Sequence, residues 1–211
     1  MRGPAGALEV RMSTSFGLTW EYRCPFARIV ADHVITALEG GADWEVEWVP
    51  FSLTQAHVAE GELDAWDDPA KADTLYAMEA GIVVRDKFPD QFLAVHRGLF
   101  DARHDAGLDL RLPEVVHSVL EANGVDATAV EADIAAGWPG AEFRKAHTEV
   151  VETRDVFGVP TFLVGDSSVF VRLMDHPDGD ADLARRTVER VLDTVTGWPS
   201  LNEFKHTRIP R

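Results

Sequence analysis

The fold of this chain is decided by residues 18–28, which read LTWEYRCPFAR and contain its only cysteine, Cys24. Apolar residues from Phe16 to Trp20 alternate with small or polar ones, and this period of two predicts a half-buried strand. After the cysteine, apolar residues recur at helical spacing until a pair of glycines ends the run. Because Pro25 favours the first position of a helix, Cys24 is expected at the N-cap, where the strand gives way to the helix.

This placement of Cys24 implies reactivity. The unpaired N–H groups and the dipole at a helix N-terminus stabilise a negative charge, so we expect the pKa of the thiol to be lowered and the nucleophilic thiolate to be populated. Arg23 and Arg28 would lower the pKa further if they lie beside the sulfur, whereas Glu21 would oppose them. The alternative interpretation is that a lone cysteine is only a small buried hydrophobic residue.

The composition narrows the classes of function. The chain has 211 residues, of which 45% are hydrophobic and 27% charged, enough for one large domain or a domain with an inserted subdomain. Its net charge of −16 argues against a nucleic-acid or anionic membrane partner. No apolar run approaches membrane-spanning length, and residues 1–10 lack the apolar core of a signal peptide. We therefore expect a cytoplasmic protein, in a compartment where thiols stay reduced.

The rest of the chain follows a definite order of elements. The patterns predict a second strand at 44–51, a block of helices at 52–155, a hairpin of strands at 159–164 and 168–173, and a final helix at 180–197. This is the thioredoxin order, an α/β fold whose βαβ and ββα halves share a mixed sheet, with a helical insertion between them. The expected division is a lead at 1–13 that could be disordered, a first half at 14–51, the insertion at 52–155, a second half at 156–197 and a tail at 198–211.

Two motifs make a resemblance specific. They are Cys24-Pro25-Phe26-Ala27 at the start of the first helix and Gly158-Val159-Pro160-Thr161 before the third strand. Together with the insertion, they resemble the DsbA-like branch of the thioredoxin superfamily, which carries Cys-Pro-x-Cys and Val/Thr-Pro-Thr at these places. Within that branch, the chain looks most like the actinobacterial proteins grouped with mycothiol-dependent nitroreductases, whose tails share an aromatic residue and a basic Lys/Arg-Thr-Arg run, as in residues 204–208.

The resemblance also implies a site. In relatives the proline of the second motif is cis and its loop faces the cysteine, so Val159 would offer its backbone groups to an extended substrate. Phe26 and Trp20 are candidates to line the pocket, although core packing would also explain them, Trp20 especially. The catalytic residue is expected to be Cys24, and the expected thiol-binding residues are Pro25, Phe26, Val159, Pro160, Thr161, Trp20 and Arg23.

One residue departs from the family pattern. Ala27 replaces the second cysteine, which in dithiol relatives attacks the mixed disulfide and releases the substrate. A monothiol site can form a mixed disulfide, but it needs a second thiol molecule to resolve it. We therefore expect a monothiol oxidoreductase that acts on a disulfide or an electrophilic small molecule, with mycothiol or glutathione as cosubstrate. The helical insertion would form a lid over the groove between Cys24 and Pro160.

No tightly bound cofactor or metal is expected. The eight histidines lack metal-ligand spacing, and the sequence has no Gly-rich phosphate loop or dinucleotide fingerprint. The expected partners are the small molecules named above, and a homodimer is a further expectation.

Two alternative functions stay open. One is an enzyme like the kappa-class glutathione transferases and the 2-hydroxychromene-2-carboxylate isomerases, which place a serine where Cys24 stands and bind glutathione without a covalent bond. The other is a non-catalytic binding protein.

Overall fold

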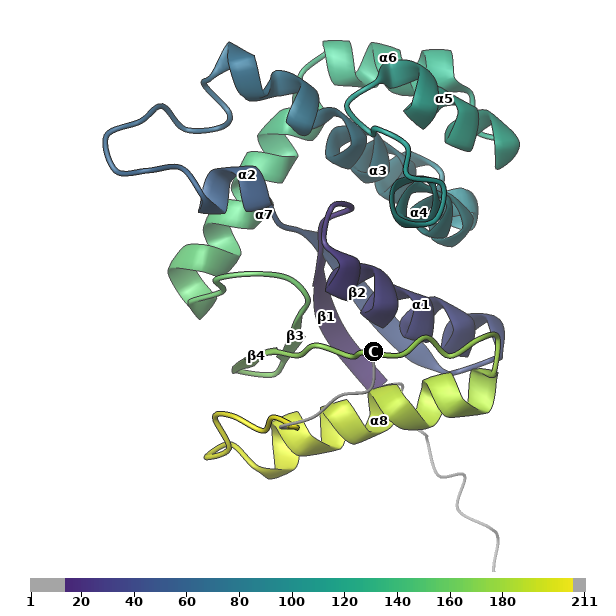
Figure 1. The fold of residues 1–211 in the computed structure, drawn as a ribbon, viewed down its shortest axis with the longest axis vertical. Coiled ribbons are helices and arrows are strands. Elements are labelled where there is room, and N and C mark those ends of the chain that lie inside the picture. The colour runs from purple at the N-terminus through teal and green to yellow at the C-terminus, as the bar shows by residue number, and fades with distance from the viewer. Residues whose placement is uncertain (1–13, 207–211) are drawn as a thin grey trace, which may run out of the picture.

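The structure, a computed structural model, describes residues 14–206 (Figure 1). The expected lead at residues 1–13 and the end of the expected tail, residues 207–211, lie outside the described residues. In the described part, no helix is both long enough and apolar enough to cross a membrane.

A four-stranded sheet forms the base of the fold. Its strands are β1 (Thr14–Trp20), β2 (Trp44–Pro50), β3 (Thr161–Val164) and β4 (Ser167–Phe170), in the order β2-β1-β3-β4. β1 runs parallel to β2 and antiparallel to β3, and β4 completes a hairpin with β3. Leu18 stands at the centre of this register, paired with Trp48 on one side and Phe162 on the other. The predicted α/β thioredoxin-like fold with a mixed sheet is therefore confirmed.

Two long helices pack side by side against this sheet (Figure 1). α1 (Pro25–Glu39) begins directly after Cys24, and α8 (Ala181–Gly197) begins after Asp180. The Asp180 carboxylate accepts a hydrogen bond of 2.8 Å from the N–H of Leu183, which satisfies one of the unpaired donors in the first turn of α8. Both helices start where the sequence predicts a start.

The remaining helices form the insertion between β2 and β3, and Figure 1 shows most of them above the loop that joins β1 to α1. They are α2 (Leu53–Ala56), the 3₁₀ helix η1 (Pro69–Thr74), α3 (Tyr76–Lys87), α4 (Pro89–His104), α5 (Pro113–Ala122), α6 (Ala127–Ala135) and α7 (Trp138–Arg154). All of them lie within the block of helices that the sequence predicts at 52–155.

The insertion is anchored on the aromatic residues that lead to the cysteine. Trp20 and Tyr22 are buried, and their ring centres lie 4.8 Å and 5.3 Å from that of His96 in α4. The hydroxyl of Tyr22 lies 3.0 Å from Nδ1 of His96. α3 approaches the same rings through Gly81, where an added Cβ would lie only 2.5 Å from the Tyr22 hydroxyl. This close packing holds the segment before Cys24 between the sheet and the insertion.

Candidate active site

Cys24 occupies the N-cap of α1, as predicted. Its backbone is extended, and its Sγ accepts a hydrogen bond from the Ala27 N–H at 3.4 Å. Pro25 takes the first helical position, and the Cys24 N–H donates to the carbonyl of Glu21 at 3.1 Å. These bonds form a tight turn between β1 and α1, in which Cys24 is only 8% exposed.

The loop before β3 lies directly against the sulfur. The Cys24 thiol donates to the Val159 carbonyl, with Sγ 3.5 Å from the oxygen. The Val159–Pro160 peptide bond is cis, and both residues are buried. The structure thus brings together three of the predicted site residues, Cys24, Val159 and Pro160, from distant parts of the sequence.

Two buried threonines fasten this loop to β1. The N–H of Thr161 donates to Oγ1 of Thr19 at 2.8 Å, and Oγ1 of Thr161 donates to the Gly158 carbonyl at 2.8 Å. Thr19 Oγ1 donates to the same carbonyl at 3.4 Å. Thr161 therefore positions the loop. Thr19 belongs to the site although the sequence analysis missed it, and its only signal is a polar side chain within an apolar strand.

The expected lowering of the Cys24 pKa is wrong. Burial of the sulfur raises the pKa of the thiol from its ordinary value of 9.0, and the negative charge of Glu21 adds to the rise. The N–H groups of Ala27 and Phe26 and the guanidinium of Arg172 lower the pKa, but they do not outweigh the lost hydration. Cys24 therefore rests as a thiol, in agreement with its hydrogen bond to the Val159 carbonyl.

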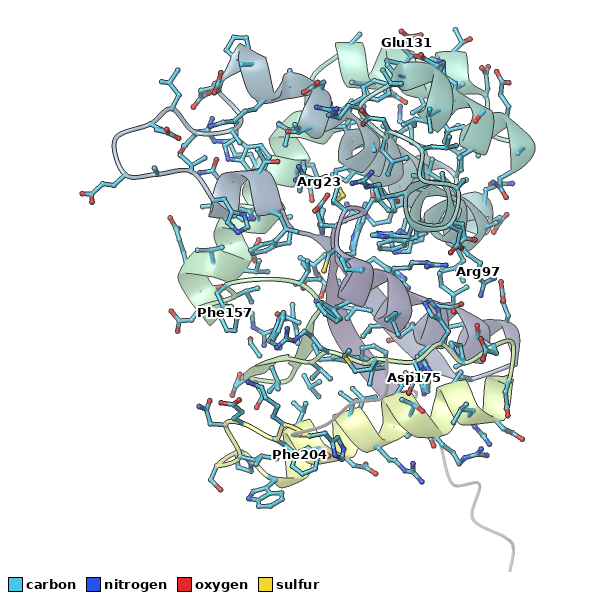
Figure 2. All side chains as sticks on the ribbon, viewed as in Figure 1. Arg23, Arg97, Glu131, Phe157, Asp175 and Phe204 are labelled. Carbon is cyan, nitrogen blue, oxygen red and sulfur yellow. The ribbon has the colours of Figure 1, made fainter. Side chains whose placement is uncertain are left out.

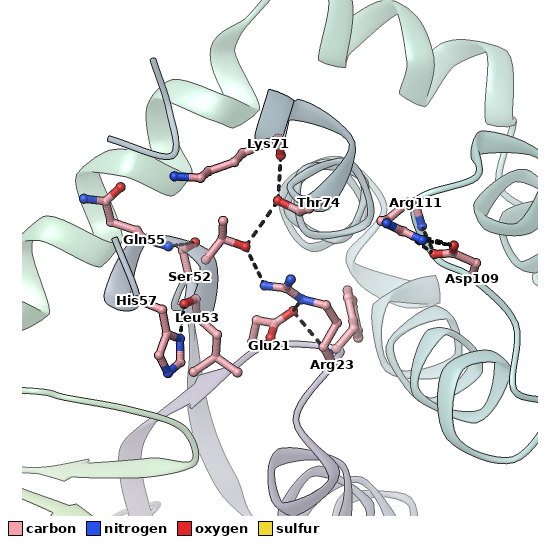
Figure 3. Close-up of polar contacts among 12 residues, drawn as sticks. Glu21, Arg23, Ser52, Leu53, Gln55, His57, Lys71, Thr74, Asp109 and Arg111 are labelled. Carbon is pink, nitrogen blue, oxygen red and sulfur yellow. Dashed lines mark hydrogen bonds and ion pairs between the residues drawn. The ribbon is translucent and has the colours of Figure 1, made fainter. Parts of the chain in front are cut away.

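The arginines nearest to Cys24 in sequence are paired with other residues, and neither contributes to the pKa shift of the thiol. Nε of Arg23 lies 2.9 Å from Oε1 of Glu21, and its guanidinium donates to Oγ1 of Thr54 at 2.7 Å (Figure 3). Arg28 is bound by two acidic residues, Asp101 and Asp105. The cation close enough to act on the Cys24 thiol is Arg172, which lies beyond β4 and which the sequence analysis did not single out.

The other predicted residues divide between the core and the site entrance. Trp20 is 1% exposed, and its ring packs against Tyr22 and His96, so core packing explains it and a place in the pocket does not. Phe26 is half-buried and lies under Arg172. Pro25 is exposed at the start of α1, next to the cysteine.

A pocket of about 480 Å³ opens on the insertion side of this site, between the loop at Arg23, α2 and η1 (Figure 3). Its lining residues are Arg23, Leu53, Thr54, His57, Glu62, Lys71 and Thr74. The hydroxyls of Thr54 and Thr74 are hydrogen-bonded to each other at 3.2 Å. The lining combines two cationic side chains, one carboxylate and two hydroxyl groups, and so suits a polar ligand. Arg23 is paired with Glu21, and Lys71 with Glu62 and Asp68.

Comparison with protein families identifies one match. The family model described as "DSBA-like thioredoxin domain" matches residues 20–180, a span that includes both Cys24 and the loop at Val159. No curated protein matches the chain.

Several solved structures share the fold. A 2-hydroxychromene-2-carboxylate isomerase is 17% identical with a TM-score of 0.60, and the match covers 89% of this chain and 100% of that one. A probable DsbA oxidoreductase from Streptomyces coelicolor is 14% identical with a TM-score of 0.58, covering 92% and 94% of the two chains. A variant of Pseudomonas aeruginosa DsbA is 18% identical with a TM-score of 0.53, covering 90% and 92%. At these identities the likeness is one of fold.

Proposed function

We propose that this chain, which belongs to the DSBA-like thioredoxin domain family, is a monothiol thiol–disulfide oxidoreductase that works with a low-molecular-weight thiol. The observation that carries the proposal is the position of the only cysteine at the N-cap of α1, against the Val159 carbonyl. Ala27 directs a backbone N–H at this sulfur from the place where dithiol relatives carry their second cysteine. The site therefore has a sulfur nucleophile and no second sulfur to release a bound substrate.

The reaction has two steps. Cys24 loses its proton to solvent and its Sγ attacks one sulfur of a disulfide, whose S–S bond breaks as a mixed disulfide forms and the other sulfur leaves as a thiolate. Mycothiol or glutathione then attacks the mixed disulfide, takes the substrate half and releases Cys24. The Ala27 N–H stabilises the negative charge on Sγ when it is released. Because the second step consumes reduced thiol, we propose a cytoplasmic location.

The pocket on the insertion side suits the polar body of such a thiol. The pocket is lined by Arg23, the residue before Cys24, and by Lys71 of η1. Glutathione carries carboxylates and mycothiol carries sugar hydroxyls, and the threonine hydroxyls of the pocket complement both kinds of group. A ligand carboxylate at Lys71 would replace Glu62, which lies 3.9 Å from Nζ of Lys71. A volume of about 480 Å³ is ordinary for a small-molecule site.

Lys71→Gln tests this assignment of the pocket. The change removes one cation, so it should slow the formation of a Cys24 adduct from oxidised glutathione several-fold and leave alkylation by the neutral reagent iodoacetamide unchanged. Lys145 of α7 is exposed, and Lys145→Gln is the matched control that should change neither rate. Equal rates of adduct formation in Lys71→Gln and the wild type would exclude the pocket as the thiol site.

A second candidate keeps the fold and changes the chemistry. Because the pKa of Cys24 is raised, the protonated thiol can donate a hydrogen bond to the sulfur of bound glutathione and stabilise its thiolate without a covalent bond. This is the chemistry of an enzyme like the kappa-class transferases or 2-hydroxychromene-2-carboxylate isomerases, and an isomerase of that name shares the fold. Intact mass spectrometry separates the candidates, since an adduct on Cys24 after incubation with oxidised mycothiol or oxidised glutathione supports the oxidoreductase. Binding of the reduced thiol with no adduct supports the second candidate.

A further inference from the structure

The β4 side of the site carries an aromatic strip, which consists of Phe26, Arg172, Phe170 and Phe157. The guanidinium carbon of Arg172 lies 5.1 Å from the ring centre of Phe26 and 5.7 Å from that of Phe170. The ring centres of Phe170 and Phe157 are 5.4 Å apart. The guanidinium and the three rings therefore form one continuous surface.

The aromatic strip lies beside the reacting sulfur. Phe157 is two residues before Val159, whose carbonyl contacts Cys24. The N–H of Val171, just beyond β4, donates to the Pro160 carbonyl at 3.1 Å. This bond holds the end of the hairpin, and with it the aromatic strip, against the loop that faces the cysteine.

The strip is largely open to solvent. Phe157, which is labelled in Figure 2, lies on the loop before β3. It is 75% exposed, Arg172 is exposed, and Phe26 and Phe170 are half-buried. Large apolar side chains that stay in water and gather beside a nucleophile indicate a surface that a ligand covers, because burial of those rings would then stabilise the complex. Core packing cannot explain a phenylalanine as exposed as Phe157.

The charge on the strip indicates the kind of ligand. Although the chain has a net charge of −16, no carboxylate within residues 14–206 forms an ion pair with Arg172. Glu203, whose pKa is lowered by Lys205 and to a smaller extent by Arg172, is itself bound to Lys205 at 2.8 Å. A guanidinium that lies over rings keeps its edge N–H groups for a carboxylate, while its flat face and the rings can stack on an aromatic group.

We propose that the aromatic strip selects planar aromatic substrates that carry a carboxylate, such as the disulfides of aromatic thiols with an acid group. This inference rests on the proposed function of Cys24. The substrate ring stacks on Phe157 and Phe170, and its carboxylate faces Arg172. Cys24 Sγ attacks the nearer substrate sulfur, the substrate S–S bond breaks, a mixed disulfide forms and the second aromatic thiolate leaves, while the thiol proton passes to solvent.

Three disulfide probes test the proposal. Dithiobis-nitrobenzoate is aromatic and anionic, dithiodipyridine is aromatic and neutral, and dithiodiglycolate is aliphatic and anionic. The loss of free Cys24 is followed by intact mass, and each variant's rate is divided by the wild-type rate so that the intrinsic reactivity of the probe cancels. Arg172→Gln should slow dithiobis-nitrobenzoate roughly tenfold and dithiodipyridine much less. Phe157→Ala should slow both aromatic probes several-fold and leave the aliphatic one unchanged.

Two control variants change exposed residues elsewhere. Arg185→Gln on α8 removes the same charge as Arg172→Gln, and Leu112→Ala in the insertion removes an exposed apolar side chain. Neither change should alter the rate with any of the three probes relative to the wild type. Arg172→Lys keeps the charge and loses the flat face, so it should slow the aromatic anion more than the aliphatic one. If Arg172→Gln and Phe157→Ala each changed the rate by the same factor for all three probes, the proposed role of the aromatic strip would be overturned. The proposed reaction of Cys24 would not be affected by that result.

A binding measurement keeps the test independent of the reaction. If Cys24 reacted with none of the probes, the proposed function would fail, but the strip could still be examined in Cys24→Ser protein. Nitrobenzoate titrated into that protein and followed by ligand-observed NMR should bind, and adding Arg172→Gln should weaken its binding roughly tenfold. Binding that does not change with Arg172 would overturn the proposal on its own.

Discussion

Sγ of Cys24 and the carbonyl oxygen of Val159 lie 3.5 Å apart, although 135 positions of sequence separate the two residues. They meet because β1, which leads to the cysteine, is the neighbour of β3, which follows the Val159 loop. The contact defines the resting state, in which a buried thiol donates to a carbonyl and its pKa is raised. Any reaction of Cys24 must therefore begin with the loss of this proton.

The first prediction concerns the pH dependence of Cys24. Because only the thiolate is reactive, the rate of alkylation by iodoacetamide should rise with pH to a midpoint above 9.0. Glu21→Gln should lower the midpoint, since the Glu21 charge opposes the thiolate, and Arg172→Gln should raise it. Glu45 of β2 is exposed, and Glu45→Gln is the control that should leave it unchanged. A wild-type midpoint below 9.0 would show that burial is not the largest influence on the pKa of Cys24.

The second prediction restores the missing sulfur. Ala27 is 2% exposed and its N–H lies 3.4 Å from Sγ of Cys24, so Ala27→Cys should form an internal disulfide and oxidise a reduced test peptide without added thiol. Ala31 is also buried in α1, but it lies one turn further along, so Ala31→Cys should not gain this activity. Catalytic oxidation of the peptide by the wild type without added thiol would disprove the monothiol mechanism.

The third prediction tests how the insertion is held against the cysteine segment. In Gly81→Ala the new Cβ would meet the Tyr22 hydroxyl at 2.5 Å and the Trp20 ring at 2.7 Å, and both side chains are buried. We expect a loss of about 1–3 kcal/mol in the free energy of unfolding, measured with urea, because the overpacked core must shift. Gly197→Ala at the end of α8 meets nothing within 4 Å and should be nearly neutral. Equal stabilities of the two variants would contradict the packing.

The fourth prediction concerns stability in acid. Burial lowers the pKa of His96 to about 3 and that of His147 to about 4. In the unfolded chain both titrate near about 6.5, so below that pH the unfolded histidines bind more protons than the folded ones, and the contribution of the two histidines to stability falls as the pH falls. At about pH 5 the loss is about 2 kcal/mol per histidine.

Urea unfolding at about pH 7.5 and about pH 5 would measure this loss. Burial raises the pKa of Glu79 to about 7, and protonation of that carboxyl offsets part of the loss. His96→Leu should therefore make the change in stability between the two pH values about 2 kcal/mol more favourable than in the wild type, whatever it does to the stability near neutral pH. If the wild type and His96→Leu showed the same pH dependence, His96 would not be the neutral buried group that the structure describes.

Local features could be predicted from the sequence, because consecutive residues carry them. The N-cap at Cys24 follows from a strand pattern, a proline and a helical pattern, and the loop before β3 follows from its Val159-Pro160 motif. The direction of the Cys24 pKa shift could not be predicted, because it depends on how much water the folded chain removes from the sulfur. The position of Arg172 over Phe26 could not be predicted either, because the two residues are far apart in sequence and the β3–β4 hairpin brings them together only in the folded chain.

The most direct test of the monothiol mechanism is the fate of the Cys24 adduct. The protein is incubated with oxidised mycothiol or oxidised glutathione and freed of excess reagent, and its intact mass is followed before and after addition of the reduced thiol. Because Ala27 cannot resolve a mixed disulfide, the adduct should form on Cys24, persist, and disappear only when thiol is added. Failure to form an adduct, or loss of the adduct without added thiol, would contradict the mechanism.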